Sequence, residues 1–257
     1  TTGAITLRQP FGGIKKSAIG PAIKAGSPNY VSQFMVFSDK SLPKVGPLTI
    51  ENQLFRLAAE WKLMVRWQQF GPLNNEMDKT VRAIRSYLFH YEKEFSQEND
   101  YFKLRGQDNI LRYLPLGTIV IRLHETDTLF ETLARITAAQ VAGNELILSV
   151  PRLLDNEVVQ FLEGKEGTRL LQDVCLERET DDDLISRMPQ VARIRYAGFD
   201  RVPEAVFQAA AKTGFYISCS PVLMEGRIEL LQYLQNQSIC HTYHRYGNLG
   251  ERTLMIS

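Results

Sequence analysis

Cysteine and histidine are scarce in this chain, with three and four residues among 257. Cys175, Cys219 and Cys240 lie far apart without a Cys-x-x-Cys spacing, which excludes a disulfide scaffold and predicts reduced thiols in the cytoplasm. His241 and His244 stand near Cys240, but zinc needs three or four ligands at usual spacings. We therefore expect no metal site.

The chain also lacks an excess of either charge and any long apolar run. The chain has 30 Lys and Arg residues and 29 Asp and Glu residues, which gives a net charge of +1. This balance lacks the excess of positive charge that is typical of nucleic-acid-binding proteins. No apolar stretch approaches the length of a membrane span, and the start does not resemble a signal peptide. A hydrophobic content of 44% instead predicts a folded core in one or two domains.

Glycine and proline are concentrated near the start, at seven of the nineteen positions from Pro10 to Pro28. This density indicates an irregular backbone path that can approach a ligand closely. Composition alone leaves a flexible linker open. Large apolar residues in the same region argue against a solvated tether and favour an ordered binding loop. They are Phe11, Ile14, Ile19, Tyr30, Phe34 and Met35.

Three short segments carry a family resemblance: QPFGG at 9–13, KSAIG at 16–20 and KAGSPNY at 24–30. They resemble the C-terminal end of aldehyde dehydrogenases, above all the glutamate-γ-semialdehyde dehydrogenase branch that occurs fused in proline utilization A (PutA). Since the chain begins within this motif, we expect it to be the C-terminal piece of a longer polypeptide. The resemblance implies that the catalytic cysteine, the general base and most of the NAD site lie outside this chain, which alone would be inactive.

The same resemblance implies a substrate-binding role for four residues. Backbone N–H groups of Gly26 and Ser27 would bind the substrate's α-carboxylate, Phe34 would pack on its aliphatic part, and Phe11 would shape the site. Consecutive N–H groups can form such an anion-binding concavity without a charged side chain.

Two amphipathic helices are predicted next, at 50–70 and 75–97, separated by Gly71 and Pro72. Together they form a helical hairpin with an aromatic seam. Its outer faces carry charges of both signs, so a solvated surface is expected. Peripheral attachment to a membrane remains a weaker alternative, because the polar faces lack a clear excess of Lys and Arg.

After Gly106, strand-like apolar runs alternate with helical patterns. This alternation predicts crossover connections and a doubly wound, largely parallel α/β sheet. The strands are expected at 119–121, 146–150, 192–196 and 215–219, and the helices at 128–142, 154–163, 180–187, 203–213 and 224–236.

This α/β part resembles the nucleotide-binding domain of an aldehyde dehydrogenase at 112–118, 135–144 and 192–213, but departs from it at the chemical positions. The family's oxyanion asparagine, ribose-binding lysine and glycine-rich turn are replaced by HETDT at 124–128, SVPR at 149–152 and GFDRVP at 198–203, respectively.

In the turn, Phe199 adds bulk and Asp200 adds a negative charge where a helix N-terminus would otherwise hold a pyrophosphate. Pro203 also removes an N–H donor. We expect a degenerate domain that binds no cofactor. The alternative left open is a module that still binds a nucleotide or small metabolite.

The ending, with PVLMEGRIE at 221–229 and YHRYGNLG at 243–250, extends the resemblance to long-form PutA enzymes over nearly the whole chain. It implies an upstream proline dehydrogenase with FAD, an upstream NAD-dependent aldehyde dehydrogenase, self-association into a homo-oligomer, and a domain that covers the passage between active sites. Interface residues are expected in the tail: Tyr243, His244, Arg245, Tyr246 and Asn248. The parts expected are 1–47 (end of the dehydrogenase domain), 48–105 (helical hairpin), 106–240 (degenerate α/β domain) and 241–257 (docking tail).

Overall fold

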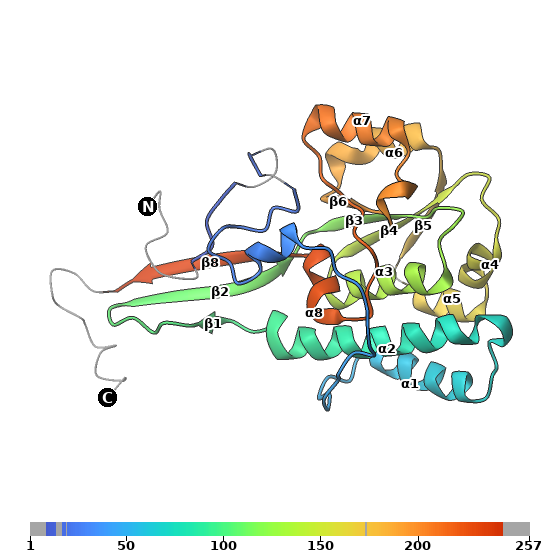
Figure 1. The fold of residues 1–257 in the computed structure, drawn as a ribbon, viewed down its shortest axis with the longest axis horizontal. Coiled ribbons are helices and arrows are strands. Elements are labelled where there is room, and N and C mark those ends of the chain that lie inside the picture. The colour runs from blue at the N-terminus through green and yellow to red at the C-terminus, as the bar shows by residue number, and fades with distance from the viewer. Residues whose placement is uncertain (1–8, 14–16, 19, 173, 244–257) are drawn as a thin grey trace.

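Two β-sheets organise the structure, a computed structural model that describes residues 9–13, 17–18, 20–172 and 174–243 (Figure 1). The larger sheet has five parallel strands in the order β5-β4-β3-β6-β7. The chain starts in the middle strand, fills one edge and then returns to fill the other, so the predicted doubly wound fold is confirmed. The strands are β3 (Thr118–Arg122), β4 (Glu145–Pro151), β5 (Cys175–Glu179), β6 (Arg193–Arg195) and β7 (Ile217–Ser218).

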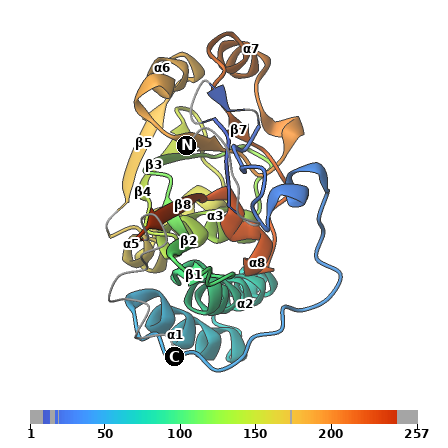
Figure 2. The ribbon, with the colours of Figure 1, turned by 90° about the vertical axis from the view of Figure 1, so that its left-hand side faces the viewer.

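The central strand β3 is buried on both faces, which explains its unbroken apolar sequence. Ile119 and Ile121 face one core with α3, while Val120 faces a second core with α6 and α7. Figure 2 shows the resulting layers: α6 and α7, the sheet, α3, and then the pair α1 and α2. The helices of the α/β part are α3 (Leu129–Val141), α4 (Glu157–Glu163), α5 (Lys165–Leu170), α6 (Asp181–Arg187) and α7 (Glu204–Thr213).

The predicted helical hairpin is present as α1 (Gln53–Arg66) and α2 (Asn74–His90), which continues into a π-helical turn at Tyr91–Phe95. It is part of the main body, because α2 packs against α3 and the two share one core. No helix within the described residues has both the length and the apolar character needed to cross a bilayer.

The helix predicted at 224–236 is wrong beyond its first half. Only α8 (Gly226–Glu229) and a 3₁₀ turn at Leu230–Gln232 are helical, and Leu234–Thr242 forms β8. This strand pairs antiparallel along its whole length with β2 (Gln107–Pro115), which the sequence reading missed. A partner more than a hundred residues away decides the conformation of β8, and strand preference depends strongly on such context.

Strands β2 and β8, with the short β1 (Asn99–Asp100) beside β2, form an antiparallel arm that extends away from the helices (Figure 1). Strand β8 runs through residue 242, so the expected boundary between 240 and 241 falls inside a strand. The four-part division of the chain stays a prediction.

The two tryptophans of the chain offer a matched test of the hairpin's packing. Trp61 is fully buried in the core, and its indole N–H donates to Glu166 at 2.8 Å, whereas Trp67, at the end of the same helix, is 70% exposed. We expect Trp61→Ala to lower the free energy of unfolding by about 3–5 kcal/mol. The control Trp67→Ala changes it by less than about 0.5 kcal/mol. Equal losses in urea titrations of the two variants would contradict the packing described.

Candidate functional site

The anchor loop, residues 24–30, is folded back against the segment that precedes it. The Phe11 N–H donates to the Ala25 carbonyl at 3.0 Å, which brings Phe11 beside Gly26. Gly26 is exposed and has φ +79°, and a Cβ there would lie 2.6 Å from the carbonyl oxygen of Gln9. Both the backbone conformation and the close contact therefore require glycine at this position.

Ser27 is buried, and its polar groups already have partners. Its N–H donates to the Lys24 carbonyl at 3.1 Å, and its hydroxyl accepts from the Asn29 N–H at 3.2 Å. A carboxylate bound at Gly26 would have to share the Ser27 N–H with that turn or displace it. The predicted role of this pair in substrate binding stays a prediction.

The two predicted aromatic residues lie on the surface of the described structure. Phe11 is 53% exposed, and Phe34 is 72% exposed at the end of the 3₁₀ helix Tyr30–Phe34. The Phe34 ring meets Tyr30 edge-on at 5.5 Å between centroids. Clustered exposed apolar side chains are typical of a surface that contacts a ligand or another protein. The predicted roles of Phe11 and Phe34 in substrate binding stay predictions.

Asn29, which sequence reasoning missed, fastens the anchor loop to the rest of the molecule. Its buried carboxamide donates from Nδ2 to the Tyr113 hydroxyl at 2.8 Å and accepts at Oδ1 from Arg227 at 2.7 Å. Burial raises the pKa of Tyr113 to about 12, so its hydroxyl stays protonated near neutral pH. The partners lie 84 and 198 positions away in the sequence, and no local pattern indicates them.

The second candidate site is the region at the carboxyl ends of β3 and β6, which is called the crevice below after the place where this fold class binds its ligands. In an open doubly wound sheet, ligands bind at the carboxyl ends of the strands where the strand order reverses, which here is between these two neighbours. The segments that follow these strands include 124–128 and 198–203, where the sequence is predicted to depart from the dehydrogenase pattern.

Ion pairs join the two sides of this crevice. Arg201, after β6, donates to Asp127 at 2.7 Å and to both carboxylate oxygens of Glu131 at 2.8 and 3.0 Å. Asp127 also accepts from Arg135, whose side chain is fully buried. The hydrogen bond to Glu131, followed by that to Asp127, raises the pKa of Arg201 well above its usual range despite partial burial. Two cations and two anions neutralise each other where a cofactor would enter.

The turn after β6 does not fit a pyrophosphate. A Cβ on Gly198 would lie 2.5 Å from a carboxylate oxygen of Asp200, so this anion covers the glycine. Pro203 caps α7 and has no N–H, while Phe199 packs edge-on against Phe207 at 5.7 Å. Negative charge, bulk and a missing donor all oppose a phosphate here. That no cofactor binds in this chain nevertheless stays a prediction.

The HETDT segment has a structural use. The Thr128 hydroxyl caps α3 by accepting from the Glu131 N–H at 3.2 Å, and the Glu131 carboxylate accepts from the Thr128 N–H at 2.9 Å. His124 bonds through Nδ1 to the Thr126 hydroxyl at 2.9 Å. These residues thus complete the N-terminal end of α3. That they replace the family's oxyanion asparagine stays a prediction.

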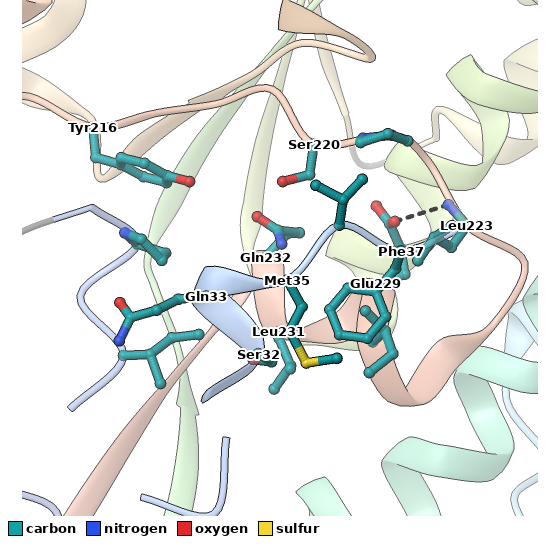
Figure 3. A pocket seen from close by; sticks show the side chains of 15 residues that line it. Ser32, Gln33, Met35, Phe37, Tyr216, Ser220, Leu223, Glu229, Leu231 and Gln232 are labelled. Atoms are coloured by element: carbon teal, nitrogen blue, oxygen red, sulfur yellow. Dashed lines mark hydrogen bonds between the residues drawn. The ribbon is translucent and has the colours of Figure 1, made fainter. Parts of the chain in front are cut away.

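A cavity of about 100 Å³ lies between the N-terminal segment and the loop that follows β7 (Figure 3). Tyr216, Ser220 and Gln232 line it on one side, and Gln33 and Met35 line it on the other. Its volume is below the roughly 300–1,000 Å³ of ordinary ligand pockets, so it is too small for a dinucleotide. No group of three or more His, Cys, Asp or Glu side chains within the described residues is arranged to hold a metal.

Of the predicted tail residues, only Tyr243 is described. Its N–H donates to the Gly106 carbonyl at 3.0 Å and its hydroxyl accepts from the Gly106 N–H at 3.2 Å, which closes the end of the arm. His244, Arg245, Tyr246 and Asn248 lie outside the described residues, so their predicted interface role stays a prediction.

No protein-family model and no curated protein sequence matches this chain. Solved structures do match. PutA from Corynebacterium freiburgense is 28% identical, with a TM-score of 0.61, over 96% of this chain and 20% of that one. PutA from Bdellovibrio bacteriovorus is 14% identical, with a TM-score of 0.50, over 65% of this chain and 19% of that one. A lactaldehyde dehydrogenase is 16% identical over 64% of this chain and 37% of its own, with a TM-score of 0.48.

The structural neighbours of this chain include PutA and aldehyde dehydrogenases. The chain spans about a fifth of the length of the PutA structures that it matches. The B. bacteriovorus structure supports the fold alone. The C. freiburgense structure, in contrast, aligns with nearly the entire chain.

Replacing Asp127 tests the ion-pair network of the crevice. Asp127→Ala leaves the fully buried Arg135 without its carboxylate partner. We therefore expect the free energy of unfolding to fall by about 3–5 kcal/mol. Asp78→Ala is the matched control, because Asp78 pairs with Arg82 at 2.7 Å on the surface and its removal costs less than about 0.5 kcal/mol. Urea unfolding of both variants gives the comparison. Similar small losses would mean that the network does not hold the crevice.

Proposed function

We propose that this chain is the C-terminal portion of a PutA-like enzyme that converts proline to glutamate by way of glutamate semialdehyde. The observation that carries this proposal is the alignment of one PutA structure with 96% of the chain at 28% identity. In this proposal, a dehydrogenase end, a helical hairpin and a degenerate α/β domain follow one another along the chain. A likeness to an isolated nucleotide-binding domain would not account for an alignment over 96% of the chain.

In this proposal the chemistry is supplied upstream. A flavoprotein part with FAD oxidises proline, and an aldehyde dehydrogenase part holds NAD and the nucleophilic cysteine. The present chain contributes the anchor loop, in which the exposed Gly26 offers its backbone to the substrate carboxylate. Phe11 lies directly beside that glycine, in a position to limit the width of the site.

The α/β domain would have a structural role: covering the passage between the active sites and supporting self-association. Supporting this, Arg201 is committed to two carboxylates and Asp200 covers Gly198. A nucleotide-binding module, the alternative, would require all these groups to move and would leave Asp127 and Glu131 facing a phosphate. We therefore favour the structural role.

Exposed side chains of the N-terminal segment support a further surface that packs on it. Val31, Phe34, Met35 and Val36 lie close together in the sequence, and all are more than half exposed. In the proposed enzyme, the aldehyde dehydrogenase part would cover them. Such a contact would bring the anchor loop to the catalytic cysteine.

Gly26→Ala in the full polypeptide tests the anchor loop. The new methyl group would meet the Gln9 carbonyl, so we expect the loop to shift and KM for glutamate semialdehyde to rise about tenfold, the equivalent of about 1.4 kcal/mol. Gly20→Ala is the control, since Gly20 also has a positive φ but no atom within 4 Å of an added Cβ. NADH formation gives KM, and equal effects of the two variants would argue against substrate contact at Gly26.

We further propose that the tail, residues 241–257, seals the covered passage, and deletion of these residues tests this role. With the passage open, the intermediate would escape, and NADH production from proline would show a lag while each activity measured separately stayed near normal. An enzyme with only the last five residues removed is the control. Immediate NADH formation by the longer truncation would count against this role of the tail.

A further inference from the structure

Both ends of the segment 21–29, which carries the Gly26–Ser27 pair, are held by side chains of the α/β part and its arm. We propose that Arg227, acting through Asn29, is a positioning residue that sets the enzyme's preference for an aldehyde bearing a carboxylate. This inference rests on the proposed function. Arg227 itself would not touch the substrate.

The first step is the connection from Asn29 to the anchor pair. The Asn29 N–H donates to the Ser27 hydroxyl at 3.2 Å, and the Asn29 carbonyl accepts from the Ser32 N–H at 3.1 Å and from the Ser32 hydroxyl at 2.6 Å. Asn29 is thus fixed on both sides within the loop, and a movement of its side chain would be transmitted to Ser27.

The second step is the choice of partners for the Asn29 carboxamide. Arginine has only donors, so Oδ1 must face Arg227 and Nδ2 must face the Tyr113 hydroxyl, which can accept. Asn29, Tyr113 and Arg227 are called the Asn29 clamp below. Because both polar ends of the amide are engaged in a buried place, rotation of the side chain would leave them without partners.

The third step is the rigidity of Arg227 itself. Its guanidinium pairs with Glu94 at 2.5 Å and lies over the Phe95 ring at 5.3 Å from the centroid. Phe95 in turn meets the Tyr113 ring edge-on at 4.9 Å. The π-helical turn after α2, strand β2 and helix α8 therefore converge on Asn29 and hold both partners of its amide.

The other end of the segment is held in a similar way. Arg193 of β6 donates to the Pro21 carbonyl at 2.9 Å and to the Gln232 carbonyl at 2.5 Å. Burial, together with the nearby positive charge of Arg195, lowers the pKa of Arg193 to about 10. Ala22, the next residue, has φ +62°, a left-handed conformation that is unfavourable for residues other than glycine. This path therefore needs support from outside the loop.

A loop held at both ends keeps its N–H groups in one arrangement before substrate arrives. Displacements of about 1 Å in a binding group can reduce turnover by orders of magnitude. Only a substrate that uses those N–H groups is affected by such a displacement. Loss of the clamp should therefore act on the carboxylate-bearing aldehyde and spare an aldehyde that lacks a carboxylate.

The test compares two aldehydes in the full polypeptide: glutamate semialdehyde and pentanal, which has five carbons and no carboxylate. We expect Arg227→Met to raise KM for the semialdehyde about tenfold and to leave the kinetics with pentanal nearly unchanged. Arg227→Lys keeps one donor and should recover part of the loss. Arg82→Met is the matched control, because Arg82 is an exposed arginine in a surface ion pair. This variant should leave KM unchanged for both aldehydes.

Equal changes with both aldehydes would overturn the proposal, because they would indicate a merely structural role, and so would no change with either. Should Arg227→Met fail to fold, Tyr113→Phe removes a single oxygen of the clamp and must show the same selective rise in KM, or the proposal fails. If the unaltered enzyme oxidises pentanal and not the semialdehyde, the proposed function itself fails. If the unaltered enzyme oxidises the semialdehyde but the clamp variants show no selective rise in KM, the proposed function stands and only the role of the Asn29 clamp is refuted.

Discussion

Arg135 lies at the centre of the interaction on which the α/β domain depends. Its fully buried guanidinium pairs with Asp127 and donates to the carbonyls of Arg122 and Arg195, at 3.0 and 3.3 Å, at the ends of the two central strands. Arg201 joins the same carboxylate from the other side of the crevice. A buried charge is costly unless an opposite charge or several hydrogen bonds compensate for its loss of water. The pairing that satisfies Arg135 therefore also engages Arg201 and joins the segments that follow the two strands.

The fold could be predicted from the sequence more fully than the candidate site, because the site depends on contacts between residues that are far apart in the chain. The apolar runs at β3 and β4 and the cap at Thr128 are local signals, and each reports a structure formed within a few residues. The departures at 198–203 indicated a disabled turn. The closure by Arg201 and Asp127 could not be foreseen, because 74 positions separate the two residues. Long-range pairing also made β8 a strand where its sequence favoured a helix.

For the anchor loop, too, contacts between residues far apart in the sequence could not be predicted. The glycine requirement at Gly26 arises within the N-terminal segment, for which the density of glycine and proline predicted an irregular backbone path. The buried amide of Asn29 was not expected, since asparagine in a glycine- and proline-rich loop usually indicates a turn. Its role depends on Tyr113 and Arg227, which belong to a strand and a helix that meet only in the folded chain. Residues that hold a binding loop are therefore harder to find in a sequence than residues that form it.

The buried arginines of the sheet show how the loop and the domain depend on each other. Arg122, Arg135 and Arg195 each pair with a carboxylate of the α/β part: Asp181, Asp127 and Glu229. Arg193 is the exception among the buried arginines of the described residues, and it instead uses a carbonyl of the N-terminal segment, that of Pro21. Without that segment, Arg193 would keep the Gln232 carbonyl and lose part of the compensation for its burial. The domain thus has a physical reason to retain the loop in place, whether or not it binds any ligand of its own.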